Sequence, residues 1–162
     1  MINTYNLFSV QVVHGKLPIQ IDLFKKIKKY VDENYSIKEK YSCREGFQYH
    51  EDFEGKKELD LLLNNYFGNT YGLQIASGWI NVLGNNSYNH PHHHAGSGNI
   101  NAAVIYFSNE NNNIVFLKEN ETFEIKPKLF DYLMFPHSLV HYVLPEQRQE
   151  KRISYAFNLR SV

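Results

Sequence analysis

The chain has 162 residues, a formal net charge of zero with histidine neutral, and a single cysteine. Its length suits one domain with a real hydrophobic core, and the balanced charge argues against nucleic acid or a charged membrane surface as a partner. The lone cysteine excludes an internal disulfide framework, and the lack of a signal-peptide pattern and of a membrane-length apolar run predicts a soluble, cytoplasmic protein.

The N-terminal part combines one β-type segment with two helices. Residues 7–14 are typical of a strand, and residues 18–35 carry apolar side chains at the three- and four-residue spacing of a helix. A second helix is predicted over residues 56–67, with Gly68 as its C-cap. The irregular, aromatic-rich segment 36–54 between the helices is a candidate substrate lid through Tyr41, Phe47, Tyr49 and His50.

From Trp79 onward the pattern changes to short strands separated by turn residues, with an Asn-rich turn at 109–113. The candidate strands are residues 79–83, 88–94, 102–107, 114–117, 122–125, 132–135, 139–144 and 152–159. This spacing predicts a mainly β, α+β fold of the jelly-roll kind, in which two N-terminal helices pack on one sheet. We expect one domain over 1–162, with N-terminal elements in 1–75 and the β core with its functional site in 76–162.

Four of the eight histidines fall within residues 90–94. Imidazole is the commonest protein ligand for zinc, iron, copper and nickel, so the cluster predicts a metal site. Strand alternation would put His90, His92 and His94 on one face and His93 on the other. The alternative is an adventitious loop that scavenges nickel or zinc.

A third ligand is expected in the second histidine-bearing stretch. His141 falls within a predicted strand, whereas His137 follows Pro136 and falls in a turn. His141 is therefore the better candidate, 49 residues after His92.

The last strand predicts an anion site. Alternate residues from Ile153 to Leu159 form an apolar core face, so Arg152, Ser154 and the residues that alternate with them line the interior. A buried arginine requires an anionic partner, and its planar fork together with a neighbouring hydroxyl suits a carboxylate. The alternative is a surface arginine on an edge strand.

This order of His-x-His, a distal histidine, and Arg-x-Ser eleven residues after it resembles the Fe(II)- and 2-oxoglutarate-dependent oxygenases. The likeness is to the prolyl-hydroxylase-like branch and to an oxygenase family frequent in phage and bacterial genomes. It rests on Trp79-Ile80-Asn81, Asn89-x-Pro91-His92-x-His94, Val104-Ile105-Tyr106-Phe107, Phe135-Pro136, His141-Tyr142-Val143-x-Pro145 and Arg152-Ile153-Ser154-x-x-Phe157-Asn158.

The resemblance implies a double-stranded β-helix, a cupin-like barrel, that uses Fe(II), 2-oxoglutarate and O2. His92 would be the first metal ligand and His141 the distal one, and His94 stands where most members carry a carboxylate. The implied reaction is hydroxylation of an unactivated C–H bond in a peptide side chain or a small metabolite, and these three histidines would be its catalytic metal ligands.

The resemblance also implies the cosubstrate contacts. Arg152 would pair with the distal carboxylate of 2-oxoglutarate, with support from Ser154, and Tyr106 and Asn81 are weaker candidates. The substrate is a small molecule or peptide, with no nucleic-acid or membrane partner. A homodimer is compatible with the sequence, and a phage-encoded protein would act in the host cytosol.

One departure from the family pattern concerns the metal ligands. The usual triad is two histidines and one carboxylate, yet no Asp or Glu lies between Asn81 and Asn109. The preferred interpretation is a three-histidine site. A register using His93 and His141 would instead place Ala95 at the carboxylate position, as in related halogenases. A degenerate site with poor iron retention is the third option.

Two other functions remain open from the sequence. Gly84, His90 and His92 fit the first half of a cupin signature, but the glutamate expected near Gly96 and Ser97 is missing. A cupin-type enzyme would not need an interior arginine. The chain could also be a non-catalytic metal-binding accessory protein of phage or bacteria.

Overall fold

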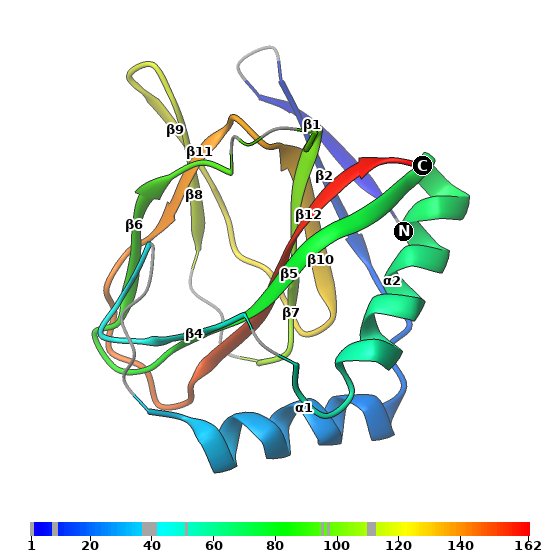
Figure 1. The fold of residues 1–162 in the computed structure, drawn as a ribbon. Helices are drawn as coiled ribbons and strands as arrows, with labels where there is room; N and C mark the ends of the chain where they lie inside the picture. The colour runs from blue at the N-terminus through cyan, green and yellow to red at the C-terminus, as the bar shows by residue number, and fades with distance from the viewer. Residues whose placement is uncertain are drawn as a thin grey trace.

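The computed structural model describes residues 2–162 except 8–9, 37–41, 51, 95, 97 and 110–112. The described residues form two helices and twelve strands, and the strands pair antiparallel in two sheets (Figure 1). The prediction of a mainly β chain with two helices and antiparallel sheets is confirmed. No helix of the described part is long and apolar enough to cross a bilayer.

The larger sheet has seven strands in the order β1-β2-β10-β7-β12-β5-β4. Its strands are β1 (Asn3–Leu7), β2 (Val10–Lys16), β4 (Phe47–Tyr49), β5 (Leu73–Leu83), β7 (Asn101–Tyr106), β10 (Asp131–Pro136) and β12 (Arg152–Ser161). The smaller sheet has five strands in the order β3-β6-β11-β8-β9. Its strands are β3 (Cys43–Arg44), β6 (Tyr88–His92), β8 (Ile114–Lys118), β9 (Glu121–Ile125) and β11 (Val140–Val143).

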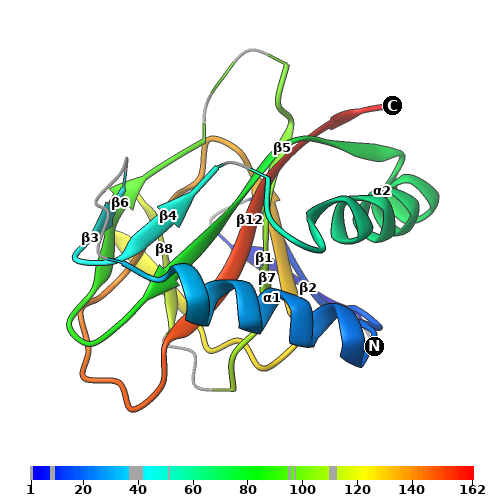
Figure 2. The ribbon, with the colours of Figure 1, turned by 60° about the horizontal axis from the view of Figure 1, so that its bottom comes forward.

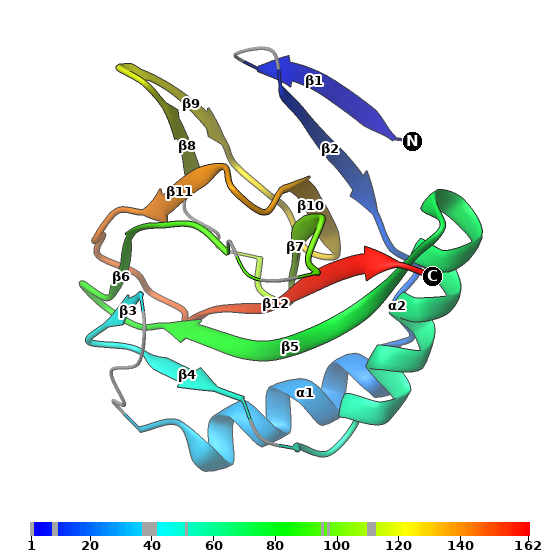
Figure 3. The same ribbon diagram turned by 45° about the horizontal axis from the view of Figure 1, so that its top comes forward.

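The two sheets lie face to face, as the view from above shows (Figure 3). An apolar cluster fills part of the space between them, with Val104 and Ala156 from the larger sheet and Ile114 and Phe116 from the smaller one. Burying such side chains between two sheets is the main favourable term in folding. The functional residues described below line another part of the same interior.

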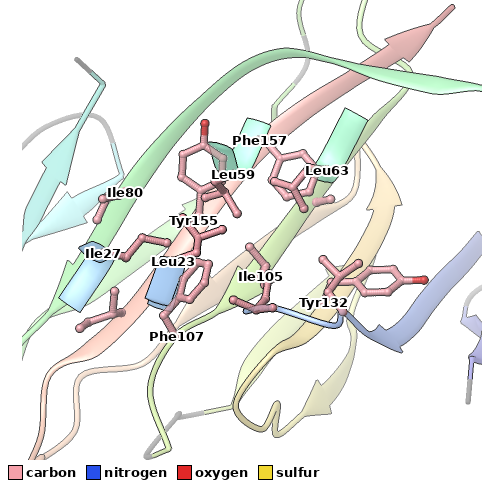
Figure 4. Packing of buried hydrophobic residues seen from close by; sticks show 14 of the residues in the cluster. Leu23, Ile27, Leu59, Leu63, Ile80, Ile105, Phe107, Tyr132, Tyr155 and Phe157 are labelled. Atoms are coloured by element: carbon pink, nitrogen blue, oxygen red, sulfur yellow. The ribbon is translucent and has the colours of Figure 1, made fainter. Parts of the chain in front are cut away.

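The opposite face of the larger sheet is covered by helices α1 (Ile21–Asn34) and α2 (Lys56–Tyr71) (Figure 2). Each helix buries one residue per turn: Leu23, Ile27 and Val31 on α1, and Leu59, Leu63 and Phe67 on α2. These side chains share one core cluster with the outward-facing residues of the sheet, among them Ile80, Ile105, Tyr132, Tyr155 and Phe157 (Figure 4). The residues of β12 that were assigned to a core face therefore do lie in a core.

Several boundaries differ from the sequence-based expectation. Helix α2 continues to Tyr71, and Gly72 rather than Gly68 adopts the left-handed conformation that ends it, with φ 66°. Segment 36–54 contains the short strands β3 and β4, and the N-terminal strand is a β1–β2 hairpin. The expected turn at 109–113 lies mostly outside the described residues, as does Tyr41 of the proposed lid.

The helix–sheet core predicts a large stability effect at Phe67. Its side chain is fully buried and its ring centroid lies 5.3 Å from that of Tyr132 and 5.4 Å from that of Phe157. Phe67→Ala should lower the free energy of unfolding by about 3–5 kcal/mol in urea titrations, because it removes apolar burial and leaves a cavity. Leu61→Ala, at a 63% exposed position of the same helix, should change it by less than about 0.5 kcal/mol.

Candidate metal and cosubstrate site

Strands β5 and β12 supply one wall of the site. They pair in register, so that Ser154 lies opposite Asn81, Ala156 opposite Trp79, and Asn158 opposite Ser77. Facing residues on an antiparallel pair share the same side of the sheet, so this row of side chains points away from the helices. Arg152 belongs to the same row, as the alternation in the sequence predicts.

Strands β6 and β11 supply the opposite wall, and their pairing contains a bulge. His92 pairs with His141 and Asn89 with Val143, so two residues of β6, His90 and Pro91, stand against one of β11. Proline has no N–H to give to a ladder, which favours a bulge at this point. The bulge turns both Asn89 and His92 to the interior. His90 therefore does not lie on the same face of β6 as His92, although strict alternation would put the two side chains on one face.

The structure brings together the three histidines that the sequence singles out. One nitrogen from each of His92, His94 and His141 lies within 4.8 Å of the others, in the only such group of three found among the described residues. Their ring centroids are 4.3 Å apart for His92 and His141, 4.9 Å for His94 and His141, and 5.4 Å for His92 and His94. His94 lies two residues beyond the end of β6, so the strand predicted over 88–94 ends earlier than expected.

All three imidazoles use Nδ1 for a hydrogen bond to a carbonyl oxygen. His92 Nδ1–H donates to the backbone oxygen of His90 at 2.8 Å. His141 Nδ1–H donates to the backbone oxygen of Leu139 at 3.0 Å. His94 Nδ1–H donates to the side-chain oxygen of Asn158, Oδ1, at 2.9 Å. A carbonyl only accepts, so the proton sits on Nδ1 and the Nε2 lone pair remains for a cation. Metal-binding histidines are commonly held in this way.

Burial also keeps these imidazoles neutral. It lowers the pKa of His92 to about 4, lowers that of His94, and holds the pKa of the fully buried His141 well below its usual range. Neutral imidazole is the form that binds a metal, so the donor set fits a divalent transition metal. No carboxylate joins this group among the described residues, which leaves three neutral nitrogen donors.

His93 and His137 lie outside the cluster. His93 is exposed, and His137 lies in the turn before β11, where its backbone oxygen accepts a hydrogen bond from the His94 N–H at 2.8 Å. The alternative register that uses His93 therefore finds no support in the geometry. Ala95, which that register would place at the vacant position, lies outside the described residues.

Arg152 is a buried cation without an acidic partner among the described residues. Its side chain is 1% exposed, its Nε has no hydrogen-bond partner, and it forms no ion pair with a described residue. One guanidinium nitrogen lies 3.4 Å from Ser154 Oγ. Burial lowers the pKa of Arg152, so the fold bears the cost of holding a charge without a counter-ion. An anionic ligand would supply the missing partner.

Tyr106 lies behind this arginine. The guanidinium carbon is 5.0 Å from the centre of the Tyr106 ring, and burial raises the pKa of the Tyr106 hydroxyl to about 12. Tyr106 does not line the cavity described next, so its place is against Arg152 rather than beside the histidines.

A single cavity connects the histidines with Arg152. It is narrow, with about 30 Å³ accessible to the centre of a water molecule, and part of it is open to solvent. Its lining residues come from both sheets: Ser42, Gln48, Trp79, Asn81, Asn89, His92, His94, Val104, Ile114, His141, Tyr142, Val143, Arg152, Ser154 and Ala156. Of the seven site residues predicted from the sequence, six line this cavity, and Tyr106 is the exception.

The sequence interpretation missed several polar residues of this cavity. Asn81 Nδ2 donates to Asn89 Oδ1 at 2.9 Å, and Asn89 Nδ2 donates to Ser42 Oγ at 3.3 Å, so a buried amide chain crosses from one sheet to the other. Asn158, which holds His94, was also not singled out as a site residue. Its position in the alternation that begins at Arg152 was the available signal.

Sequence comparison finds one family match. The family described as "Putative 2OG-Fe(II) oxygenase" matches residues 110–158, a segment that contains His141, Arg152 and Ser154. His92 and His94 precede the matched segment. Among curated proteins, no sequence matches this chain.

Solved structures of similar fold cover nearly the whole chain. A prolyl-4-hydroxylase of Pseudomonas putida is 13% identical, with a TM-score of 0.69 over 97% of this chain and 96% of that one. A viral collagen prolyl hydroxylase from Paramecium bursaria Chlorella virus 1, solved with 2-oxoglutarate, is 13% identical, with a TM-score of 0.65 over 93% and 96%. HygX of Streptomyces hygroscopicus, solved with nickel, 2-oxoglutarate and hygromycin B, is 10% identical, with a TM-score of 0.66 over 93% and 83%.

The fold over most of the chain is therefore similar to that of 2-oxoglutarate-dependent oxygenases, and residues 110–158 match the model of a 2OG-Fe(II) oxygenase family. The resemblance to the prolyl-hydroxylase-like branch that the sequence predicts is confirmed, by the family match over residues 110–158 and by the fold over most of the chain.

Proposed function

We propose that this chain is an Fe(II)- and 2-oxoglutarate-dependent dioxygenase that hydroxylates an unactivated C–H bond. The observation that carries the proposal is the single cavity lined both by three converging imidazoles and by a buried arginine without an acidic partner among the described residues. The two facing sheets would serve as a double-stranded β-helix, within one domain over 1–162.

His92, His94 and His141 would hold the metal through Nε2. When bound, ferrous iron supplies the redox chemistry of this class, in which O2 and 2-oxoglutarate are converted to CO2 and succinate as a substrate is hydroxylated. The backbone carbonyls of His90 and Leu139 keep two of the rings in one tautomer. The walls of the cavity limit the access of water to the reacting groups.

Arg152 would bind the distal carboxylate of 2-oxoglutarate through its guanidinium fork, and the Ser154 hydroxyl beside it would donate a further hydrogen bond. Asn81 stands opposite Ser154 on β5, and its Nδ2 donates one hydrogen to Asn89 Oδ1, so the second N–H of the same amide could donate to the ligand. Tyr106 would support Arg152 through its ring face.

The donor set also explains why a dianion suits this cavity. Three neutral imidazoles leave the full charge of a divalent metal uncompensated, and Arg152 adds another positive charge. A dicarboxylate with a 2-oxo group can place one carboxylate at each end. Opposite charges brought together in a cavity of low dielectric attract strongly, which favours such a ligand over a neutral one.

The substrate is proposed at the level of its class. Prolyl hydroxylases are among the structures of similar fold, one of them in complex with a peptide, and HygX holds hygromycin B. A peptide side chain or a small metabolite is therefore the proposed substrate. Trp79 lines the cavity, stacks on His50 with ring centroids 5.1 Å apart and lies tilted against His94 at 5.2 Å, so it is a candidate wall of the substrate entrance.

The test measures cosubstrate binding and turnover separately. Purified under nitrogen and loaded with Fe(II), the protein should develop a visible charge-transfer absorption when 2-oxoglutarate is added. On exposure to O2 it should convert 2-oxoglutarate to succinate, at least slowly and without added substrate. Tight metal binding with neither the absorption change nor succinate would contradict the proposal and would favour a metal-binding protein of another kind.

A further inference from the structure

His94 is held differently from the other two candidate ligands. His92 and His141 each donate Nδ1–H to the backbone oxygen of the residue two positions earlier, an acceptor that no substitution removes. His94 donates instead to the side-chain oxygen of Asn158, at 2.9 Å. The orientation of this one imidazole therefore depends on the identity of another side chain.

The backbone gives His94 less support than it gives its partners. His92 and His141 lie on paired strands, opposite each other, whereas His94 lies beyond the end of β6. Its backbone N–H donates to the His137 oxygen at 2.8 Å, which fixes the chain but not the rotation of the ring. A side-chain acceptor is the remaining way to fix that rotation.

Asn158 is well placed to be that acceptor. It lies on β12 directly opposite Ser77 of β5, and its Nδ2 donates to Ser77 Oγ at 3.0 Å. With its Nδ2 toward Ser77, the amide presents its oxygen to His94 Nδ1. Hydrogen bonds between Ser77 and Asn158 and between Asn158 and His94 thus connect the β5–β12 pair, at the residue just before its register shift, to an imidazole beyond the end of β6.

We propose that Asn158 is a positioning residue, which holds His94 with its proton on Nδ1 and its Nε2 lone pair toward the other two imidazoles. The inference rests on the proposed function, because it assigns Asn158 a role in metal binding. It also accounts for a polar side chain at this position of β12, where the cavity wall ends.

The expected effect is a loss of metal affinity without a matching loss of stability. Partners that orient a ligand histidine commonly contribute 10–100-fold in metal affinity. Asn158 is partly exposed, so water can replace it in part, and Asn158→Leu should weaken cobalt(II) binding by about tenfold. Asn158→Asp keeps an acceptor oxygen and should stay within about threefold of the wild type, because a carboxylate orients imidazole as well as an amide does.

The experiment reads the tautomer and the affinity separately. Long-range proton–nitrogen NMR spectra of the metal-free protein, labelled with 15N-histidine, should show His94 as the Nδ1–H tautomer in the wild type and in Asn158→Asp. In Asn158→Leu this signal should change to Nε2–H or to a mixture. Cobalt(II) affinities come from competition with a chromophoric chelator. Asn64→Leu is the control, because it removes an acceptor used by the Ile75 N–H at 2.7 Å and does not touch the site.

Three outcomes separate this inference from the proposed function. Lost Nδ1–H signal and weaker cobalt binding in Asn158→Leu, with rescue by Asn158→Asp and no change in Asn64→Leu, support it. An Asn158→Leu protein with the wild-type tautomer and affinity overturns the positioning role and leaves the proposed function standing. A wild-type protein that binds no cobalt overturns the proposed function and the metal role of Asn158 with it.

Discussion

Replacing Arg152 with methionine should abolish 2-oxoglutarate binding while leaving metal binding within about threefold of the wild type. The guanidinium is the only cationic group among the described residues that line the cavity, and no described acidic residue forms an ion pair with it. Losing one partner of a buried, hydrogen-bonded charge pair costs about 2–5 kcal/mol, which corresponds to a loss of roughly 30-fold to a few thousandfold in affinity. Calorimetric titration of the metal-loaded protein with 2-oxoglutarate measures it.

Although Arg152→Met should lose 2-oxoglutarate binding, it should make the ligand-free protein more stable. Without an anion, Arg152 is a buried charge that the fold tolerates at a cost, so Arg152→Met should raise the free energy of unfolding of the ligand-free protein by about 1–3 kcal/mol in urea titrations. Gain of stability with loss of binding is the pattern expected of a residue kept for function.

Replacing a second arginine, Arg148, tests whether the loss of 2-oxoglutarate binding is specific to Arg152. Arg148 donates hydrogen bonds to backbone oxygens of Gly84 and Ser87, and so joins two loops. Arg148→Met should therefore destabilise the protein and leave the affinity for 2-oxoglutarate within about threefold. If Arg152→Met bound 2-oxoglutarate normally, or if both variants lost binding equally, Arg152 would not be the carboxylate site.

The fold could be predicted from the sequence wherever a periodic pattern was long. The alternation from Arg152 to Leu159 gave both the strand and its two faces, because one face enters the helix–sheet core and the other lines the cavity. Helix ends were harder to place. Gly68 and Gly72 are both C-cap candidates, and the choice depends on where β5 must begin, which is a tertiary constraint.

The candidate site was predictable in its residue types but not in its details. Strand alternation left His90, His92 and His94 as candidates, and the family resemblance selected His92 and His94 together with His141. The bulge at Pro91 depends on how β6 pairs with β11 and so on residues far apart in the sequence. The amide chain from Asn81 to Asn89 crosses between the sheets for the same reason. Contacts of this kind cannot be predicted from the neighbouring sequence, because an asparagine considered alone is typical of a turn or of the surface.

The absence of a carboxylate from the histidine group follows from sequence and structure together. No Asp or Glu occurs near His92 in the sequence, and no described acidic residue from elsewhere in the fold joins the cluster. Three neutral donors bind copper, nickel and zinc more tightly than ferrous iron, since affinity at a given site follows the general order of the divalent metals. Loading with Fe(II) should therefore be done with the other metals removed.

A histidine scan should divide the cluster into ligands and bystanders. His141→Ala is expected to have the largest effect, because His141 is fully buried at the centre of the group, within 4.9 Å of both other rings. If the apparent 10–16 kcal/mol of a four-ligand zinc site is shared evenly, one ligand contributes roughly 3 kcal/mol, so affinity should fall about 100-fold or more. His92→Ala and His94→Ala should fall in the same range.

His90→Ala and His93→Ala are the matched controls, because they remove imidazoles from the same five-residue segment but outside the converging group. Each should change cobalt(II) affinity by less than about threefold, since a side chain that does not contact the ion loses no ligand bond. Equal losses at all of these positions would indicate a loop that binds metal through any of its histidines. A loss confined to His92, His94 and His141 would instead require one defined site, since the five substitutions remove the same chemical group and differ only in where the fold places it.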